Sequence, residues 1–342
     1  MSIVLRGVVL ATCLFALTAC DSSEERAEKH YQNALKLLEA GDVPRAILEF
    51  RNTLALDDRH RDARLAYARA ALDSGNTPEA YANYLRIAEE FPQDTEARQK
   101  LSEIAILAQN WDEAERHGKA LVAAGASGDE VAIVELALAF REAAMADDKP
   151  RVRDLTRRAE ELAARNPNDD ILVRVLIEGY LSDDRIPDAI GVTDAILESD
   201  TDTSVFYQVM AELLIAEGDT DRLEGHFRRT IAKFPDDEDT KGNLISLLVA
   251  EGRGDQAEQF LREEIEAAEE KIPTHVSLIA LIRQLRGDPA ALEEIEVALT
   301  IYDQAPLLKA LKAGLVFDAG DQVAAIALMQ SITDDVEPSA QV

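Results

Sequence analysis

The stretch Arg61–Asp94 decides the fold, and it reads RDARLAYARAALDSGNTPEAYANYLRIAEEFPQD. Its first half carries apolar residues three or four positions apart, at Leu65, Ala68 and Leu72. This spacing is typical of one face of an α-helix and not of a strand. Gly75 can adopt the left-handed backbone that ends a helix, and Pro78 suits the first turn of the next one. Pro92 disfavours helix at the residue before it. The stretch therefore predicts two helices joined by a tight turn.

A family resemblance follows from the positions of the small, aromatic and proline residues in this 34-residue unit. The pattern has a small residue at position 8, glycine at 15, alanine at 20, an aromatic at 24 and proline at 32, which are here Ala68, Gly75, Ala80, Tyr84 and Pro92. It resembles the tetratricopeptide repeat (TPR). Only position 27, usually alanine, departs from the pattern, as Ile87. Small residues at positions 8 and 20 would let the two helices approach closely, with the tyrosine filling the space beside them.

The turn of this unit recurs along the chain at intervals of 33 to 35 residues, with one longer interval. It falls at Gly41, Gly75, Gln109, Asp184, Gly218, Gly252, Gly287 and Gly320. The longer interval holds one further unit with about seven extra residues, and we expect a hinge there, at Ala144–Lys149. The resemblance implies an all-α, right-handed, TPR-like superhelical solenoid of about nine helical-hairpin repeats after a lipoprotein signal peptide. An irregular solenoid of other helical pairs is the alternative, because several later units match the pattern less well.

The repeat intervals and the N-terminal residues together predict three parts of the chain. Residues 1–19 are expected to form a lipoprotein signal peptide, residues 20–26 a lipidated cysteine with a short tether, and residues 27–342 the solenoid. The nine predicted repeats lie near 27–60, 61–94, 95–128, 129–168, 170–203, 204–237, 238–271, 273–305 and 306–339.

The N-terminus predicts an anchor rather than part of the fold. An uncharged, mostly apolar run follows Arg6, and it is too short to span a bilayer but suits a secretory signal. Its end, LTAC at residues 17–20, resembles a bacterial lipobox, which implies cleavage between Ala19 and Cys20 and acylation of Cys20. Several acyl chains would hold the protein firmly on the periplasmic side of a membrane. Asp21 resembles an inner-membrane retention signal, so the inner membrane is favoured over the outer. An ordinary signal peptide cut near Ala19 is the alternative.

Charge and motif content argue against several classes of function. The formal net charge of −30 repels phosphates, so we expect no nucleic-acid partner. The five histidines fall in different units and form no HExxH motif, and the glycines serve the turns, so we expect no enzyme, no cofactor and no metal. Glu113 and His117 could share one metal ion, but an exposed pair on a helix is the simpler interpretation. Trp111 is expected to pack between helices rather than to form a ligand platform.

The resemblance also implies a binding groove. In TPR proteins, positions 2, 5, 9 and 12 of each first helix line the concave side and hold an extended peptide or a partner helix. The predicted groove residues are Tyr31, Arg69, Gln99, Glu103, Arg174, Glu178, Gln208, Glu212, Ser246 and Ser277. Arg69 and Arg174 are isolated in sequence, so a clamp for a C-terminal carboxylate is not expected.

The sequence shows no polar capping helix after the ninth repeat, although solenoids normally end in one. We expect its apolar stripe, including Ile326 and Ile332, to be covered by a partner, by a second copy or by further chain beyond Val342. The whole pattern favours a membrane-anchored periplasmic scaffold that binds envelope proteins. Residues 46–81 resemble TPR lipoproteins of exopolysaccharide export and of PEP-CTERM protein sorting. Outer-membrane or pilus assembly is an alternative scaffold role, and direct binding or turnover of envelope polysaccharide is an alternative of another class.

Overall fold

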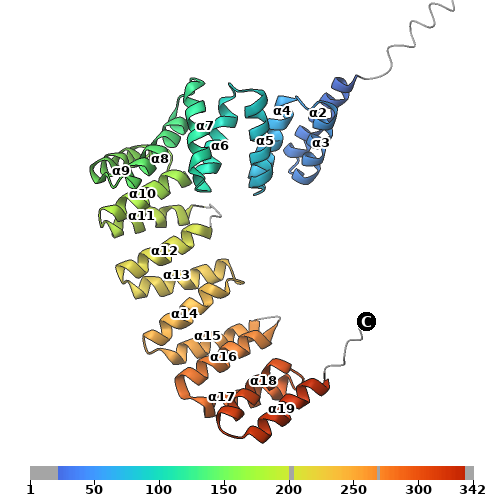
Figure 1. Ribbon diagram of the computed structural model, residues 1–342, viewed down its shortest axis with the longest axis vertical. Helices are drawn as coiled ribbons and strands as arrows, with labels where there is room; N and C mark the ends of the chain where they lie inside the picture. The colour runs from blue at the N-terminus through green and yellow to red at the C-terminus, as the bar shows by residue number, and fades with distance from the viewer. Residues whose placement is uncertain (1–21, 200–203, 268–269, 336–342) are drawn as a thin grey trace, which may run out of the picture. The chain divides into compact units, whose positions relative to one another are not determined.

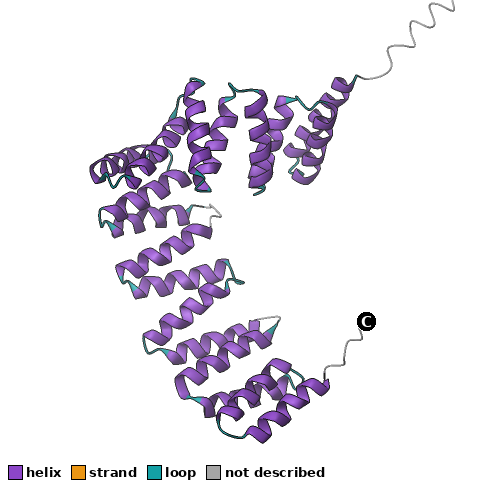
Figure 2. Ribbon diagram, viewed as in Figure 1, coloured by secondary structure: helices purple, strands orange, loops and turns teal. Residues whose placement is uncertain are grey.

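The computed structural model describes residues 22–199, 204–267 and 270–335. Over these ranges the chain forms eighteen α-helices joined by short turns, with no strand (Figure 2). The helices are α2 (Ser23–Glu39), α3 (Val43–Leu56), α4 (Arg61–Asp73), α5 (Thr77–Glu90), α6 (Thr95–Leu107), α7 (Trp111–Ala123), α8 (Asp129–Met145), α9 (Lys149–Ala163), α10 (Asp170–Ser182), α11 (Ile186–Glu198), α12 (Ser204–Glu217), α13 (Thr220–Lys233), α14 (Glu238–Ala250), α15 (Gly254–Ala267), α16 (Lys271–Arg286), α17 (Asp288–Ile301), α18 (Pro306–Asp318) and α19 (Gln322–Asp335). The predicted signal peptide, its cleavage site and Cys20 lie outside the described residues.

The chain divides into two compact units, Met1–Phe206 and Tyr207–Val342, and the division falls within α12. In the first unit the helices pack as five consecutive hairpins, from α2 with α3 to α10 with α11 (Figure 1). In the second unit each helix from α13 to α19 packs against the next one along the chain. The predicted all-α stack of about nine helical hairpins is therefore confirmed.

One turn geometry connects the two helices of most hairpins. At Gly75 the backbone has φ +78°, and its N–H donates to the carbonyl of Leu72 over 2.9 Å. The next N–H, from Asn76, donates to the carbonyl of Ala71 over 2.8 Å, so two carbonyls at the helix end are satisfied. Non-glycine residues take the same left-handed conformation at three of these turns: Gln109, Asp147 and Asp184.

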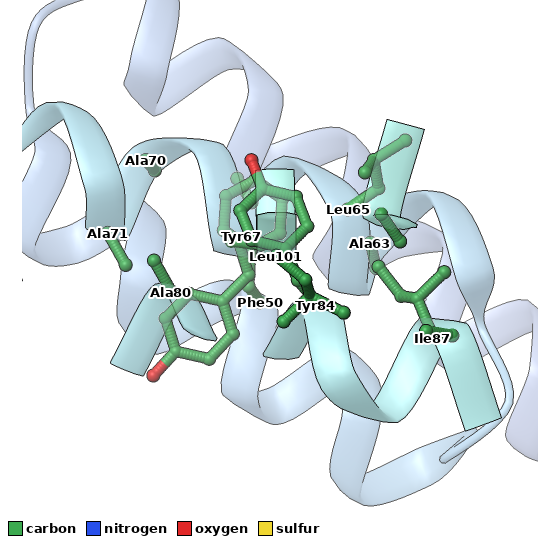
Figure 3. Packing of buried hydrophobic residues seen from close by; sticks show 14 of the residues in the cluster. Phe50, Ala63, Leu65, Tyr67, Ala70, Ala71, Ala80, Tyr84, Ile87 and Leu101 are labelled. Atoms are coloured by element: carbon green, nitrogen blue, oxygen red, sulfur yellow. The ribbon is translucent and has the colours of Figure 1, made fainter. Parts of the chain in front are cut away.

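Small and aromatic residues alternate in the core, as the repeat pattern predicts. Ala68 and Ala80 are fully buried, which lets α4 and α5 approach closely. Tyr84 is also fully buried beside them, and Phe50 and Leu101 connect this hairpin to its neighbours (Figure 3). A second cluster, around Ile279, Ile295 and Leu308, holds α16, α17 and α18 together. Each hairpin thus buries its apolar face against the next hairpin, and not around one common centre.

Two features differ in the structure from the simplest sequence-based expectation. The extra residues of the fourth repeat lengthen its helices and do not form a separate linker: α8 has 17 residues and α9 has 15, whereas α6 and α7 have 13 each. The turn between α8 and α9 is as tight as the others, because the Asp147 and Asp148 N–H groups donate to the carbonyls of Ala144 and Ala143.

The expected tether, residues 20–26, also ends early, since α2 begins at Ser23. A capping box causes this start: the hydroxyl of Ser22 accepts from the Glu25 N–H, and the Glu25 carboxylate accepts from the Ser22 N–H.

Candidate functional site

The predicted groove residues all lie on the first helices of their hairpins, and none of them is buried. They fall on α2 (Tyr31), α4 (Arg69), α6 (Gln99, Glu103), α10 (Arg174, Glu178), α12 (Gln208, Glu212), α14 (Ser246) and α16 (Ser277). The structure brings together the members in neighbouring hairpins of the first unit. The last four belong to the second unit.

Most of these polar side chains are already satisfied within the chain. The Arg69 guanidinium donates two hydrogen bonds to the Glu96 carboxylate, over 2.6 and 2.5 Å. Four other side chains donate a hydrogen bond to a group one turn away on their own helix: Gln99 to Glu103, Gln208 to Glu212, Ser246 to the Gly242 carbonyl and Ser277 to the Pro273 carbonyl. Such surfaces offer little unmatched charge to a partner.

The exception is a pocket in the first unit, which we call the Trp111 pocket. It has a free volume of about 90 Å³, and its lining residues are Ile106, Gln109, Trp111, Ala137, Phe140, Arg141, Ile171, Arg174, Val175 and Glu178. These residues come from α6, the turn before α7, and from α7, α8 and α10. The three first helices α6, α8 and α10 all touch one another at this place, so α6 and α10 meet directly although α8 lies between them in sequence.

Trp111 is half-buried, so it packs between helices and also exposes part of its ring to this pocket. The guanidinium carbon of Arg141 lies 5.2 Å from the centre of the indole ring, within the range of a cation–π contact. The expected packing between helices therefore accounts for the buried part of the ring, and the exposed part lines the pocket.

Two arginines and one glutamate set the charge of the Trp111 pocket. The guanidinium carbon of Arg174 lies 5.7 Å from the Phe206 ring centre, and its Nε is buried with no hydrogen-bond partner. Glu178 opens to solvent on one side, but the surrounding protein removes enough water to raise the pKa of its carboxyl. The positive charges of Arg141 and Arg174 partly oppose that rise. The site is thus a partly desolvated place where one carboxyl and two guanidinium groups influence one another.

Sequence analysis missed the α8 side of this pocket. Arg141, Phe140 and Ala137 line it, and none of them was predicted as a groove residue. A signal existed, because counting from Asp129 makes Ala137 and Phe140 positions 9 and 12 of the fourth repeat. The irregular length of that repeat concealed this register.

The Glu113–His117 pair is not the exposed pair that was expected. His117 is fully buried, and its Nε2 lies 3.4 Å from the Glu113 carboxylate. Its Nδ1 lies 3.1 Å from a guanidinium nitrogen of Arg98, and its Nε2 lies 3.1 Å from one of Arg116. Burial and these two cations lower the pKa of His117 to about 4, and Glu113 only partly opposes them. The described ranges contain no cluster of three or more potential metal-ligating side chains.

Apolar side chains are open on the last hairpin. Phe317 on α18 is 53% exposed, and Ile326 and Met329 on α19 are 56% and 48% exposed. They line a shallow groove with the small residues Ala310, Ala313 and Gly314. Elsewhere α18 packs on α17 of the preceding hairpin, where Ile295 is fully buried. Among the helices of the described ranges, none is both long and apolar enough to cross a bilayer.

Comparison with known proteins finds a repeat family in the N-terminal part of the chain. The tetratricopeptide repeat family matches residues 31–95 and 65–129. No curated protein matches the chain.

Among solved structures, a tetratricopeptide repeat protein from Parabacteroides merdae is 11% identical, with a TM-score of 0.36, and the alignment covers 90% of this chain and 99% of that one. PilW, described as a widely conserved type IV pilus biogenesis factor, is 13% identical, with a TM-score of 0.45 and coverage of 64% and 98%. The human IFIT1 dimer with PPP-AAAA is 15% identical, with a TM-score of 0.47 and coverage of 90% and 72%.

Proposed function

We propose that this chain, which carries tetratricopeptide repeats, is a scaffold that binds an extended segment of a partner protein on the first helices of its first unit. The repeat itself supports a protein-binding role, since stacked helical hairpins present a long surface built for recognition. The observation that carries the proposal is the Trp111 pocket, where three first helices meet around an aromatic ring and two arginines. Aromatic and arginine side chains are the residue types that most often dominate binding energy at protein interfaces.

The proposal places this scaffold in a bacterial envelope, facing the periplasm and held by lipid on Cys20. The sequence LTAC at residues 17–20 supports the anchor, and Asp21 favours the inner membrane. Exopolysaccharide export or protein sorting is the assembly that the sequence resemblance favours, with outer-membrane or pilus assembly as the alternative. The acidic surface suits an anchored protein that meets proteins rather than lipid headgroups or nucleic acid, because like charges repel.

Two measurements test the scaffold and its anchor. Metabolic labelling with a palmitate analogue is expected to label the full chain and not a Cys20→Ala variant. In cells, crosslinking followed by affinity purification is expected to recover envelope proteins with the full chain and fewer of them with Cys20→Ala. An Arg141→Gln variant, which keeps the anchor, is expected to lose partners that use the Trp111 pocket. Binding of purified envelope glycan without any protein partner would instead support the alternative that the chain acts on polysaccharide directly.

The partner proposal also includes a second copy of this chain on the last hairpin. Phe317, Ile326 and Met329 are about half exposed there, and no other helix of the described residues covers them. A second copy carries the same small and apolar groove, so one two-fold contact would bury both grooves at once. Sedimentation of the full chain at increasing concentration tests this contact, and Ile326→Glu is expected to abolish any association.

A further inference from the structure

We infer that the Trp111 pocket binds one acidic side chain of an extended peptide, with an aliphatic side chain two residues away entering the apolar part of the same pocket. This inference rests on the proposed scaffold function and names the chemistry of its partner. It follows from two features of the pocket, which are its arginine side chains and the volume of its apolar part. The geometry of an extended peptide then connects the two.

The two arginines of the pocket, Arg141 and Arg174, can accept a carboxylate from a ligand. Elsewhere in the first unit many arginines have a carboxylate in direct contact, as Arg61 has Asp94 and Arg69 has Glu96. Among the described residues, neither Arg141 nor Arg174 has a carboxylate within ion-pair distance. Glu178 on the same pocket and Asp170, one turn before Arg174 on α10, interact with these arginines only at longer range. Both guanidinium groups therefore lack a direct carboxylate partner, on a protein whose formal net charge is −30.

The Arg174 side chain also lacks a partner of its own. Its Nε is buried without a hydrogen-bond acceptor, although a buried donor of this kind normally has one. A ligand carboxylate can accept from guanidinium groups in the fork geometry that arginine presents. Because the pocket is already partly desolvated, such hydrogen bonds would be stronger than on an open surface. The guanidinium groups without a direct carboxylate partner and the unpaired Nε donor of Arg174 thus point to the same ligand group.

The apolar part of the pocket calls for a second, uncharged group. Ile106, Phe140, Ile171 and Val175 line it, and its free volume of about 90 Å³ equals roughly three water molecules at about 30 Å³ each. That space suits one aliphatic side chain. In an extended peptide, side chains two residues apart point to the same side, so one segment can deliver both groups. A helix would instead place such pairs three or four residues apart.

The experiment uses the full chain and Trp111 as its reporter, because the chain contains a single tryptophan. Two blocked peptides serve as probes, acetyl-SALSEAS-amide and its isosteric partner acetyl-SALSQAS-amide. Binding is followed by Trp111 fluorescence and, independently, by the anisotropy of fluorescein-labelled peptides. We expect the glutamate peptide to bind at least tenfold more tightly than the glutamine peptide at low salt, and the ratio to fall as salt is added.

Two variants assign the effect to the pocket. Arg141→Gln removes a charge from an exposed side chain and is expected to abolish the preference for the glutamate peptide. Arg157→Gln is the matched control: it removes a charge from α9, where Arg157 contacts Asp154 and Glu161, and it should keep the full preference. Equal affinity for the two peptides, no binding of either, or an unchanged preference in Arg141→Gln would overturn the inference. Partner capture by the full chain in cells would then still stand, because the crosslinking test does not depend on these peptides.

Discussion

The buried His117 predicts that acid destabilises one particular hairpin. The imidazole is fully buried beside Arg98 and Arg116, and its pKa in the folded chain is about 4, against about 6.5 in an unfolded chain. As the pH falls, the unfolded state therefore takes up a proton well before the folded state does. The neutral His117 imidazole contributes stability that is fully present above about pH 6.5 and is lost as the pH falls towards 4.

The size of the effect follows from these two pKa values. Between pH 7 and pH 5 the unfolded histidine goes from mostly neutral to almost fully protonated, while the folded one stays mostly neutral. The linkage relation then gives a loss of about 2 kcal/mol in the free energy of unfolding over this interval. A His117→Gln variant has no titrating group at this position, so it should not show this part of the loss. Carboxylates elsewhere contribute equally to both proteins and cancel in the comparison.

Urea unfolding of both proteins at pH 7 and pH 5 provides the assay. Trp111 lies on α7, the same helix as His117, so its fluorescence reports unfolding of the part of the chain that contains His117. We expect the original protein to lose about 2 kcal/mol more than His117→Gln between the two pH values. Equal losses in the two proteins would refute the view that His117 is held neutral by burial and by its neighbouring arginines.

Three further predictions follow from packing, each with its own measurement. Tyr84→Ala should cost about 3–5 kcal/mol in chemical denaturation because it empties a fully buried site, whereas Tyr84→Phe should be neutral or stabilising because the buried hydroxyl has no hydrogen-bond partner. Gly179→Ala would place a methyl group 2.2 Å from the Thr156 hydroxyl and should lower stability by about 1–3 kcal/mol, and adding Thr156→Ala should restore most of the loss. Ile326→Glu should leave the circular dichroism spectrum unchanged and make sedimentation independent of concentration; persistent association would exclude the last hairpin as the contact.

Much of the fold could be predicted from the sequence because the repeat signal is local. Glycine at a left-handed turn, as at Gly75, and small residues at a close approach, as at Ala68 and Ala80, each have a direct physical reason. The same reasons hold in every hairpin, so an error in one repeat does not spread to the next. The fourth repeat was the exception, because its extra residues move the turn at Asp147 out of the 34-residue interval that located the glycine-free turns at Gln109 and Asp184.

The Trp111 pocket could not be predicted in the same way. It depends on Arg141 and Arg174 facing one space, and these residues lie in different repeats of unequal length. In the sequence, Arg174 has no second arginine at a matching position of a neighbouring repeat. The repeat pattern did not show that α6, α8 and α10 would all contact one another. The burial of His117 was missed because spacing along α7 does not show what the other helix of the same hairpin, α6, places against it, such as Arg98.

The direct contact between α6 and α10 has a consequence for how this part of the chain unfolds. In an ordinary solenoid each repeat contacts only the adjacent repeats. Its stability is then the sum of the stabilities of the repeats and of the interfaces between neighbours. Here the third and fifth hairpins are coupled to each other as well as to the fourth, which closes a small loop of interactions. Opening any one of the three removes support from both others, so the segment from α6 to α11 should melt as one cooperative block and should not tolerate excision of its middle member.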